Sequence, residues 1–461
     1  MSNNMAVLLT LIAYQVALLG LGLWARTRTH DSSDFILGGR TLGASVAALS
    51  ASASSSSAWS LLGVSGAAFA WGLPAIWLLP ATMLGFVINW CWVAPRLMKA
   101  SRNDGSLTLI SFLADNVQGR LRIPIRRFGA VIVVFSFVFY VAAQFQAAGT
   151  AFSSSLGMES NDAMIVGAAV VLAYVLLGGF WAVSITDALQ GLLMALTSIL
   201  LPLVCILSVD GSVVYQDLMG PNSTWVTGAG LAGVGFVVGL LGIGLGYPGQ
   251  PHVVNRFMAL KDERSLRHGR IIALSWAAVL YCGMLITGWY ARSVLGAIDN
   301  TESALLEVSQ QLLPPVIAGV MTAAVLSAIM STADSQLHVA GAAVSHDFSR
   351  NSGASLSRTR QTVAGVTIVA LVLALFAPQD IFSRVLFAWH ALGSALGPAL
   401  VLRLCGRQIA GPWLLASMVA GFALTVIAHL LPNTPGDIAE RYVPLLVALA
   451  LAAYGSFKSK A

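Results

Sequence analysis

Residues 50–57 read Ser-Ala-Ser-Ala-Ser-Ser-Ser-Ser and lie near the middle of an apolar stretch that extends from residue 43 to residue 72. Because a membrane helix satisfies its own backbone groups, stretches this polar survive at membrane depth only where they line a cavity. Each interruption of this kind also has a simpler interpretation: small serines allow close helix packing, and glycine with proline ends a span before a loop. A second interruption closes the apolar run 228–250, with Gly242, Gly244, Gly246, Pro248, Gly249 and Pro251.

The whole chain is apolar, with 57% hydrophobic and 10% charged residues among 461 and a mean hydropathy of +0.81. An ordinary soluble domain has about a quarter charged residues. We therefore expect an all-α polytopic membrane protein in which residues 1–461 form a single transmembrane domain. Thirteen runs are long enough to cross a bilayer, at about 5–25, 43–72, 74–95, 128–152, 162–180, 185–209, 228–250, 271–291, 313–345, 361–378, 382–402, 411–431 and 442–457.

The basic residues predict the orientation of these spans. Lysine and arginine concentrate in the cytoplasmic loops of membrane proteins, and here 22 of the 25 basic residues fall in one set of alternate loops. Arg292, Arg384 and Arg441 are the three exceptions. The pattern predicts an N-terminus outside the cell and a C-terminus in the cytoplasm.

The two interrupted runs hold matching positions once the first run is set aside. The second and seventh runs then open two groups of five spans, at about 43–209 and 228–402. An odd number of spans in each group gives the two halves opposite orientations. Paired interrupted helices in two inverted repeats indicate a midplane site for a solute and an ion in a transporter. One N-terminal and two C-terminal helices lie outside the repeats.

The ninth run carries polar residues on a single helical face, at offsets 0, 4, 7, 8 and 11. Thr332 lies beside this stripe. A carboxylate within a span is costly and normally faces the bundle interior in an ion or proton path, so we expect a functional role for the aspartate, with a hydrogen bond to a neighbouring span as the alternative. The stripe consists of Ser327, Ser331, Asp334, Ser335 and His338.

Two further polar residues have competing interpretations. Asp187 follows Ser184, Ile185 and Thr186 near the start of the sixth run, and this spacing alone favours an N-terminal helix cap. His390 lies within the eleventh run, where a lone histidine is more often packed and hydrogen-bonded than part of a proton relay.

Several function classes are excluded by the motifs that the sequence lacks. No Gly-Lys pair occurs, so the phosphate-binding P-loop is absent and we expect no ATP hydrolysis. The HExxH and GxSxG motifs of hydrolases are absent as well, and the chain is not expected to be an enzyme. The loop positions of the basic residues explain the net charge of +6 without nucleic acid. An ion gradient remains as the energy source, worth about 2.3 kcal/mol per charge and 100 mV.

Five strings along the chain, in the same order, resemble the sodium:solute symporter family and, within it, the bacterial sodium/proline symporters. The resemblance covers roughly residues 5–455. The strings are DFILGGRTLG at 34–43, SITDALQ at 184–190, GYPGQPHVVNRFMA at 246–259, MSTADSQL at 330–337 and ALGSALGP at 391–398.

The resemblance implies two inverted five-helix repeats that work by alternating access, and sodium as the coupling ion. It places a sodium site between the second and ninth spans, made of three backbone carbonyls and two hydroxyls. Unwound carbonyls are free to bind a cation. The implied ligands are Ala53, Ser56, Ala328, Ser331 and Thr332.

Some members of the family have a second sodium site. The matching residues here are Asp187, Ser331 and Ser335, with Asp334 close enough to contribute. The resemblance therefore favours a functional role for Asp187 over the helix cap.

The solute positions of the proline symporters carry over onto Ser57, Tyr140, Tyr247 and Pro251. Two departures affect the expected site. The carboxylate that proline symporters have at position 55 is replaced by Ser55, and the tryptophan before Gly-Leu-Gly-Tyr is replaced by Ile243 in the predicted solute site.

We expect a sodium-coupled symporter that imports a small organic solute, with proline favoured, across the bilayer of the bacterial inner membrane, and that functions as a monomer. A sensory module of the same fold, which reports its bound solute to a partner protein, is the alternative. A passive channel is a weaker third interpretation. Sodium-driven uptake would separate the symporter from both.

Overall fold

The computed structural model describes residues 3–26, 36–115, 117, 119–175, 180–208, 210–219, 224–228, 230–348, 356–378, 380–432 and 434–458. Asp34 and Phe35 of the first family string lie outside these residues, as do short pieces of the predicted spans at 176–179, 209 and 229. Within the described ranges the regular structure is helical, and the only β-pairing is an isolated bridge between Leu42 and Leu260.

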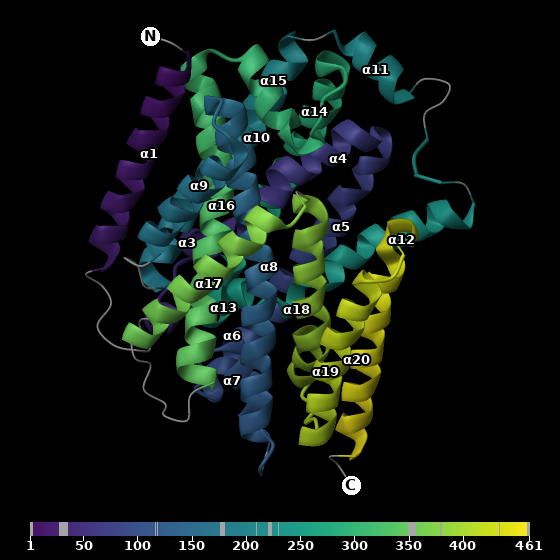
Figure 1. Ribbon diagram of the computed structural model, residues 1–461. Helices are drawn as coiled ribbons and strands as arrows, with labels where there is room; N and C mark the ends of the chain where they lie inside the picture. The colour runs from purple at the N-terminus through teal and green to yellow at the C-terminus, as the bar shows by residue number, and fades with distance from the viewer. Residues whose placement is uncertain are drawn as a thin grey trace.

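The helices follow one another along the chain and are labelled in Figure 1. Their bounds are α1 Asn3–Arg26, α3 Ala44–Ser55, α4 Val64–Trp71, α5 Leu78–Val87, α6 Ala94–Asn103, α7 Leu109–Ala114, α8 Arg122–Leu156, α9 Ser160–Val175, α10 Phe180–Ser208, α11 Gly211–Met219, α12 Leu231–Leu245, α13 Pro251–Ala259, α14 Glu263–Leu295, α15 Ala304–Leu312, α16 Pro315–Ala342, α17 Leu356–Phe376, α18 Ile381–Leu404, α19 Gly411–His429 and α20 Ile438–Lys458.

Ten of the described helical segments are long and apolar enough to cross a membrane. Three shorter apolar helices, Val7–Leu21, Trp59–Trp71 and Ser160–Leu172, lie where three more spans were predicted. The outward face of α10 exposes Leu192, Leu196 and other large apolar side chains, which in water would be unfavourable and in lipid are not. The protein is therefore an all-helical, polytopic membrane protein.

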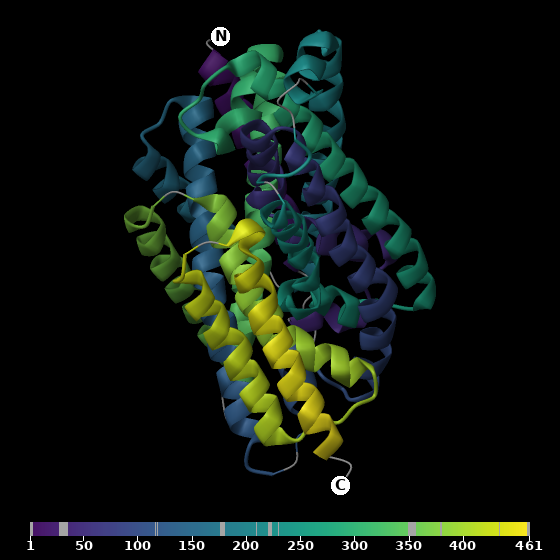
Figure 2. The ribbon, with the colours of Figure 1, turned by 90° about the vertical axis from the view of Figure 1, so that its right-hand side faces the viewer.

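Helices α16 and α18 form the interior of the bundle. Both are almost entirely buried, and α16 packs against α1, α3, α8, α10 and α17. The pair α19 and α20 lies along one side of the molecule, coloured yellow in Figure 2. The start of α1 and the end of α20 lie at opposite ends of the molecule (Figure 1).

Both predicted interruptions are present. Helix α3 ends at Ser55, and a π-helical turn at Trp59–Gly63 leads into α4. Here serine side chains bond to the backbone of their own segment: Ser55 Oγ donates to the Ser52 carbonyl at 3.0 Å, and Ser57 Oγ accepts from the Trp59 N–H at 3.2 Å. We call residues 56–58 the first break.

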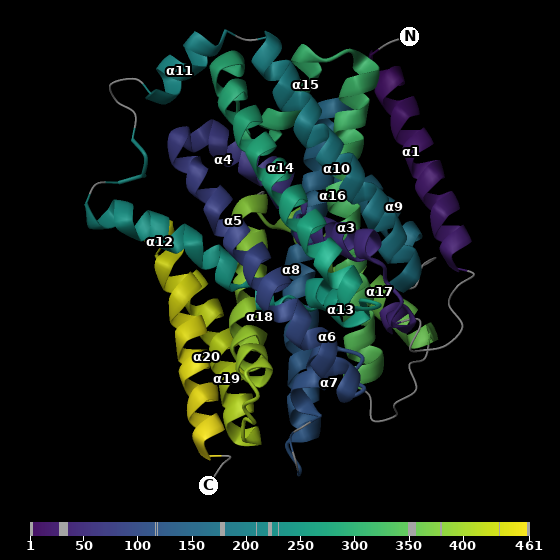
Figure 3. The ribbon, with the colours of Figure 1, turned by 180° about the vertical axis from the view of Figure 1, so that it is seen from behind.

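Helix α12 ends at Leu245, and a 3-10 turn at Tyr247–Gly249 leads to α13. Pro248 and Pro251 have no N–H to donate, so each removes a hydrogen bond that a continuous helix would need. We call residues 246–250 the second break. Helices α3 and α13 pack against each other near the middle of the molecule (Figure 3).

Candidate functional site

The first break faces two hydroxyls of α16. Ser331 Oγ donates to the carbonyl of Ala53 and, within its own helix, to that of Ala328, both at 3.3 Å. Thr332 Oγ1 donates to the carbonyl of Ser54 at 3.2 Å and reaches that of Ala53 at 3.5 Å. The structure thus brings together four of the five predicted sodium ligands.

Ser56, the fifth, belongs to the same turn, because its N–H donates to the carbonyl of Ala53 at 3.2 Å. Its hydroxyl is buried and has no hydrogen bond of standard geometry within the described chain. In this structure the backbone carbonyls beside the first break accept hydrogen bonds from the hydroxyls of α16. The same oxygens are the hard ligands that a sodium ion takes from unwound helices.

Asp187 is the centre of a buried polar network. Its Oδ2 accepts hydrogen bonds from Ser50 at 2.8 Å, Ser54 at 3.1 Å and Ser335 at 3.2 Å. The guanidinium of Arg256 is the fourth donor, with its Nη2 lying 2.9 Å from Asp187 Oδ2. Since α10 begins at Phe180, Asp187 lies well inside the helix, and its interpretation as an N-terminal cap is wrong.

Arg256 is a member of this network that the sequence misplaced. It was counted among the basic loop residues, but it lies in α13 and is fully buried. Its guanidinium also donates to Ser50 at 3.1 Å and to Ser335. The feature of the sequence that could have indicated its burial is its place in the string at 246–259, shortly after the second break.

Asp334 lies in the same region as a second buried carboxylate. Neither of its oxygens has a hydrogen bond of standard geometry among the residues that the structure describes. The charges of Asp187 and Arg256 are close enough to act on it. Two carboxylates therefore lie near one guanidinium, and ionising both would leave one negative charge without a protein counter-ion there.

The predicted solute residues form two groups. At the first break, the Tyr140 hydroxyl donates to Ser57 Oγ at 3.3 Å. At the second break, the ring of Tyr247 lies against that of Trp389 with centroids 4.6 Å apart, and the Trp389 indole donates to the carbonyl of Ile243 at 3.2 Å. The Trp389 indole of α18 thus lies beside both Tyr247 and the backbone of Ile243.

Pro251 opens α13 and is buried. The next residue, His252, connects the two groups and was not predicted from the sequence. Its ring centroid lies 6.1 Å from that of Tyr140 and 6.3 Å from that of Trp389. His390 is packed and hydrogen-bonded as expected, since its Nδ1 contacts the carbonyl of Leu386 at 2.7 Å.

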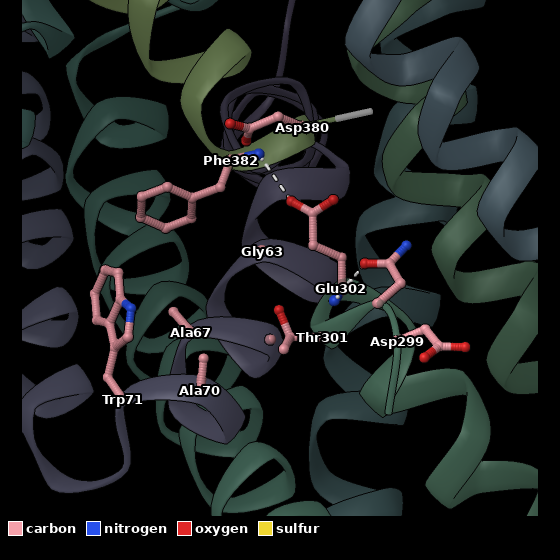
Figure 4. Close-up of a pocket in the computed structure, with 11 residues that line it drawn as sticks. Gly63, Ala67, Ala70, Trp71, Asp299, Thr301, Glu302, Asp380 and Phe382 are labelled. Atoms are coloured by element: carbon pink, nitrogen blue, oxygen red, sulfur yellow. Dashed lines mark hydrogen bonds between the residues drawn. The ribbon is translucent and has the colours of Figure 1, made fainter. Parts of the chain in front are cut away.

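A separate cavity of about 500 Å³ lies at the end of the molecule where α1 begins, and none of the predicted site residues lines it. Figure 4 shows Glu302 pointing toward the start of α18. Its Oε1 accepts from the N–H of Phe382 at 2.8 Å, and its Oε2 from that of Ile381 at 3.3 Å. Burial raises the pKa of Glu302 to about 7, although these two N–H groups favour the charged form.

At the opposite end, Arg40 ties three segments together. Its guanidinium donates to the carbonyl of Ser106 and to both the hydroxyl and the carbonyl of Ser101. It also donates to the carbonyl of Met258 at 3.0 Å. These contacts could not be predicted from the sequence, apart from the place of Arg40 in the string at 34–43.

Comparison with known proteins agrees with the fold and identifies the family. Residues 35–421 match the model of the sodium:solute symporter family. The chain is 33% identical over 437 residues to the osmoregulated proline transporter OpuE of Bacillus subtilis, covering 92% of this chain and 89% of that one. It is 34% identical over 444 residues to the sodium/proline symporter of Escherichia coli, covering 92% and 88%.

A solved structure shares the fold. It is the substrate-bound, outward-open state of a Na+-coupled sialic acid symporter, with a TM-score of 0.79, 16% identity and coverage of 98% of both chains. The family match covers most of the chain and both breaks. The chain therefore belongs to the sodium:solute symporter family and is a sodium-coupled solute symporter rather than an enzyme.

Proposed function

We propose that this symporter imports a small amino acid or a related solute, with proline favoured, by alternating access. The observation that carries the proposal is the contact between the hydroxyls of Ser331 and Thr332 on α16 and the freed carbonyls of the first break. A sodium ion bound by Ala53, Ser56, Ala328, Ser331 and Thr332 would replace these hydrogen bonds with ligand bonds. Ion binding would then tie α16 to the broken helix.

A second cation site at Asp187, Ser331, Asp334 and Ser335 follows from the charges. Arg256 already compensates Asp187, with which it shares the contact to Ser335. The ionised carboxylate of Asp334 would be a buried negative charge without a protein counter-ion, which is unfavourable unless a cation is bound. We propose that a second sodium ion supplies this charge.

The solute is proposed from two sources. Two of the relatives reported above are named as proline transporters, and Ser57, Tyr140, Tyr247 and Pro251 lie at the two breaks where the solute is expected. Ile243 is the position at which selectivity would depart from that of those relatives.

The remaining expectations are part of the same proposal. We propose thirteen spans with inverted repeats at about 43–209 and 228–402, an N-terminus outside, and a monomer in the bacterial inner membrane. The three shorter apolar helices support the count. The opposite ends at which α1 begins and α20 finishes are consistent with an odd number of spans (Figure 1).

The test is uptake of radiolabelled proline into proteoliposomes with an inward sodium gradient, compared with an equal potassium gradient. Thr332→Ala should abolish sodium-dependent uptake. Thr322→Ala is the matched control, because Thr322 lies on the same helix but bonds to Ser155 at 2.8 Å, away from the break. Uptake that ignores sodium would contradict the coupling, and binding without uptake would favour the sensory module.

A further inference from the structure

Helix α8 presents two residues, one turn apart, to the first break. Tyr140 donates to Ser57, as described above. Gln144 follows four residues later and is fully buried. Its Oε1 accepts from the backbone N–H of Ala58 at 3.1 Å. The two side chains thus hold consecutive residues of the unwound segment.

The contact with Ala58 fixes the orientation of the Gln144 amide. A backbone N–H can only donate, so the amide oxygen must face Ala58 and the NH2 group must point away from it. This Nε2 has no hydrogen-bonded partner in the described part of the chain. The indole Nε1 of Trp59, the residue after Ala58, is also buried and unpartnered there. Both atoms are donors.

A second glutamine on α8 shows what a structural role requires. Gln146 is buried as well, but its Nε2 donates to the carbonyls of Ala374 at 3.0 Å and Ala377 at 3.2 Å. Its Oε1 accepts from Arg384 at 2.6 Å. The amide of Gln146 is therefore satisfied by the protein, while that of Gln144 is only half satisfied.

We infer that Gln144 is a specificity-determining residue, whose amide N–H, together with the indole N–H of Trp59, donates to a carboxylate of the transported solute. The inference rests on the proposed function and names the chemical class of its solute. Buried donors are costly unless an acceptor meets them, and a carboxylate accepts the strongest of such bonds. A solute without this group would leave both donors unpaired on closure of the site.

Thermal unfolding of the purified protein in sodium and in potassium buffer tests this inference. The solutes are L-proline, L-alanine, glycine betaine and L-lactate. Each is compared with the molecule that lacks only its carboxylate: pyrrolidine, ethylamine, tetramethylammonium and ethanol. We expect sodium-dependent stabilisation by at least one carboxylate and by none of the four partners. Stabilisation by a partner, or by no carboxylate at all, overturns the inference.

The matched variants are Gln144→Glu and Gln146→Glu. Gln144→Glu keeps an oxygen for the Ala58 N–H but turns the donor into a second acceptor, and should weaken the apparent affinity for the carboxylate about 10- to 100-fold. Gln146→Glu should lower the melting temperature and leave that affinity unchanged. An unchanged affinity in Gln144→Glu overturns the inference. Gln144→Met, which has similar volume and cannot donate, provides the same comparison if Gln144→Glu does not accumulate.

Failure of this inference and failure of the proposed function give different results. A solute that is taken up with sodium but has no carboxylate contradicts only the role of Gln144. Absence of sodium-driven uptake for every solute that binds contradicts the symporter itself.

Discussion

The two broken helices solve the same backbone problem in different ways. At the second break, amide side chains bond to backbone carbonyls: Gln250, within the break, donates from Nε2 to the carbonyl of Gly246 at 3.1 Å and to that of Trp389 in α18 at 2.8 Å, and Asn89 Nδ2 donates to the carbonyl of Tyr247 at 3.2 Å. At the first break, hydroxyls do so instead, since Ser331 and Thr332 of α16 donate to the carbonyls of Ala53 and Ser54.

Backbone packing shows the same difference. Gly249 and Gly246 lie directly against Gly393 of α18, so close that a Cβ on Gly249 would come within 2.6 Å of the Gly393 Cα. The second break is thus braced against α18 at backbone distance. The first break instead meets α16 through the hydroxyls of Ser331 and Thr332, where the sodium site is proposed. The second break, which also carries proposed solute residues, is the one that is braced by close backbone packing.

Arg256 joins the two breaks, and its loss should have the largest effect. It starts from α13, beyond the second break, and reaches Ser50 and Asp187 beneath the first. Arg256→Met leaves a buried carboxylate without its partner, which costs about 3–5 kcal/mol. We expect a strongly reduced thermal stability and little protein in the membrane.

The double variant Arg256→Met/Asp187→Asn separates charge from packing. Removing both charges should restore part of the stability lost in either single variant, because no buried charge is then left unpaired. Thermal unfolding of the three variants measures this coupling. Losses that simply add would show that the ion pair does not connect the two breaks.

Gly393→Ala tests the brace. A Cβ at this position would meet the Cα of Gly246 at 2.7 Å, and backbone cannot move aside as a flexible side chain can. We expect a loss of about 1–3 kcal/mol from overpacking, measured as a lower melting temperature. Gly365→Ala in α17 is the control, since a Cβ there meets nothing within 4 Å. Equal stability of both variants would contradict the brace.

The interruptions were predictable because their cause is local. Runs of serine, and clusters of glycine with proline, disturb a helix locally, and Ser331 and Thr332 lie on α16 together with Ala328, three and four residues away from it. Arg256 could not be placed in this way, because its burial depends on Asp187, which is 69 positions away. The capping of α18 by Glu302 and the contact of the Gln144 amide with Ala58 likewise depend on segments that are distant in the sequence.

The capping pattern around Asp187 misled for a different reason. Ser184, Thr186 and Asp187 fit the start of a helix, but the aromatic residues before them, Phe180 and Trp181, already belong to α10. Local spacing could not show that the helix begins earlier. Only the serines of α3, packed against α10, reveal why a carboxylate is tolerated there.

A pair of smaller changes sharpens the contrast between binding site and brace. Ser331→Ala removes one of the two hydroxyls of the proposed sodium site, and its hydrogen bonds within the protein are long, at 3.3 Å, so we expect weaker sodium binding with only a small loss of stability. Gln250→Leu removes two hydrogen bonds from the second break, so we expect a loss of about 1–2 kcal/mol at unchanged sodium affinity. Sodium titration and thermal unfolding of both variants provide the test. Lower sodium affinity in Gln250→Leu, together with lower stability in the variant at the sodium site, would contradict the comparison.

The smallest expected effect lies at the outer end of α18, the helix that braces the second break. Glu302 caps this end, and burial raises its pKa to about 7 from an ordinary value of 4.5, with Asp380 adding to the rise and Arg384 opposing it. The capped state therefore binds a proton more tightly than a state in which Glu302 is hydrated. By linkage, the cap is most favoured below the ordinary pKa, and this advantage is lost as the pH rises through 7.

A distance label between residues 299–303 and the start of α18 should report this shift. We expect the two segments to draw closer as the pH falls from about 8 to about 6. Glu302→Gln is neutral and similar in shape, and its amide oxygen can still accept from the N–H of Phe382, so it should keep the short distance at every pH. A separation that grows as the pH falls, or a pH dependence that persists in Glu302→Gln, would show that another group controls this end of α18.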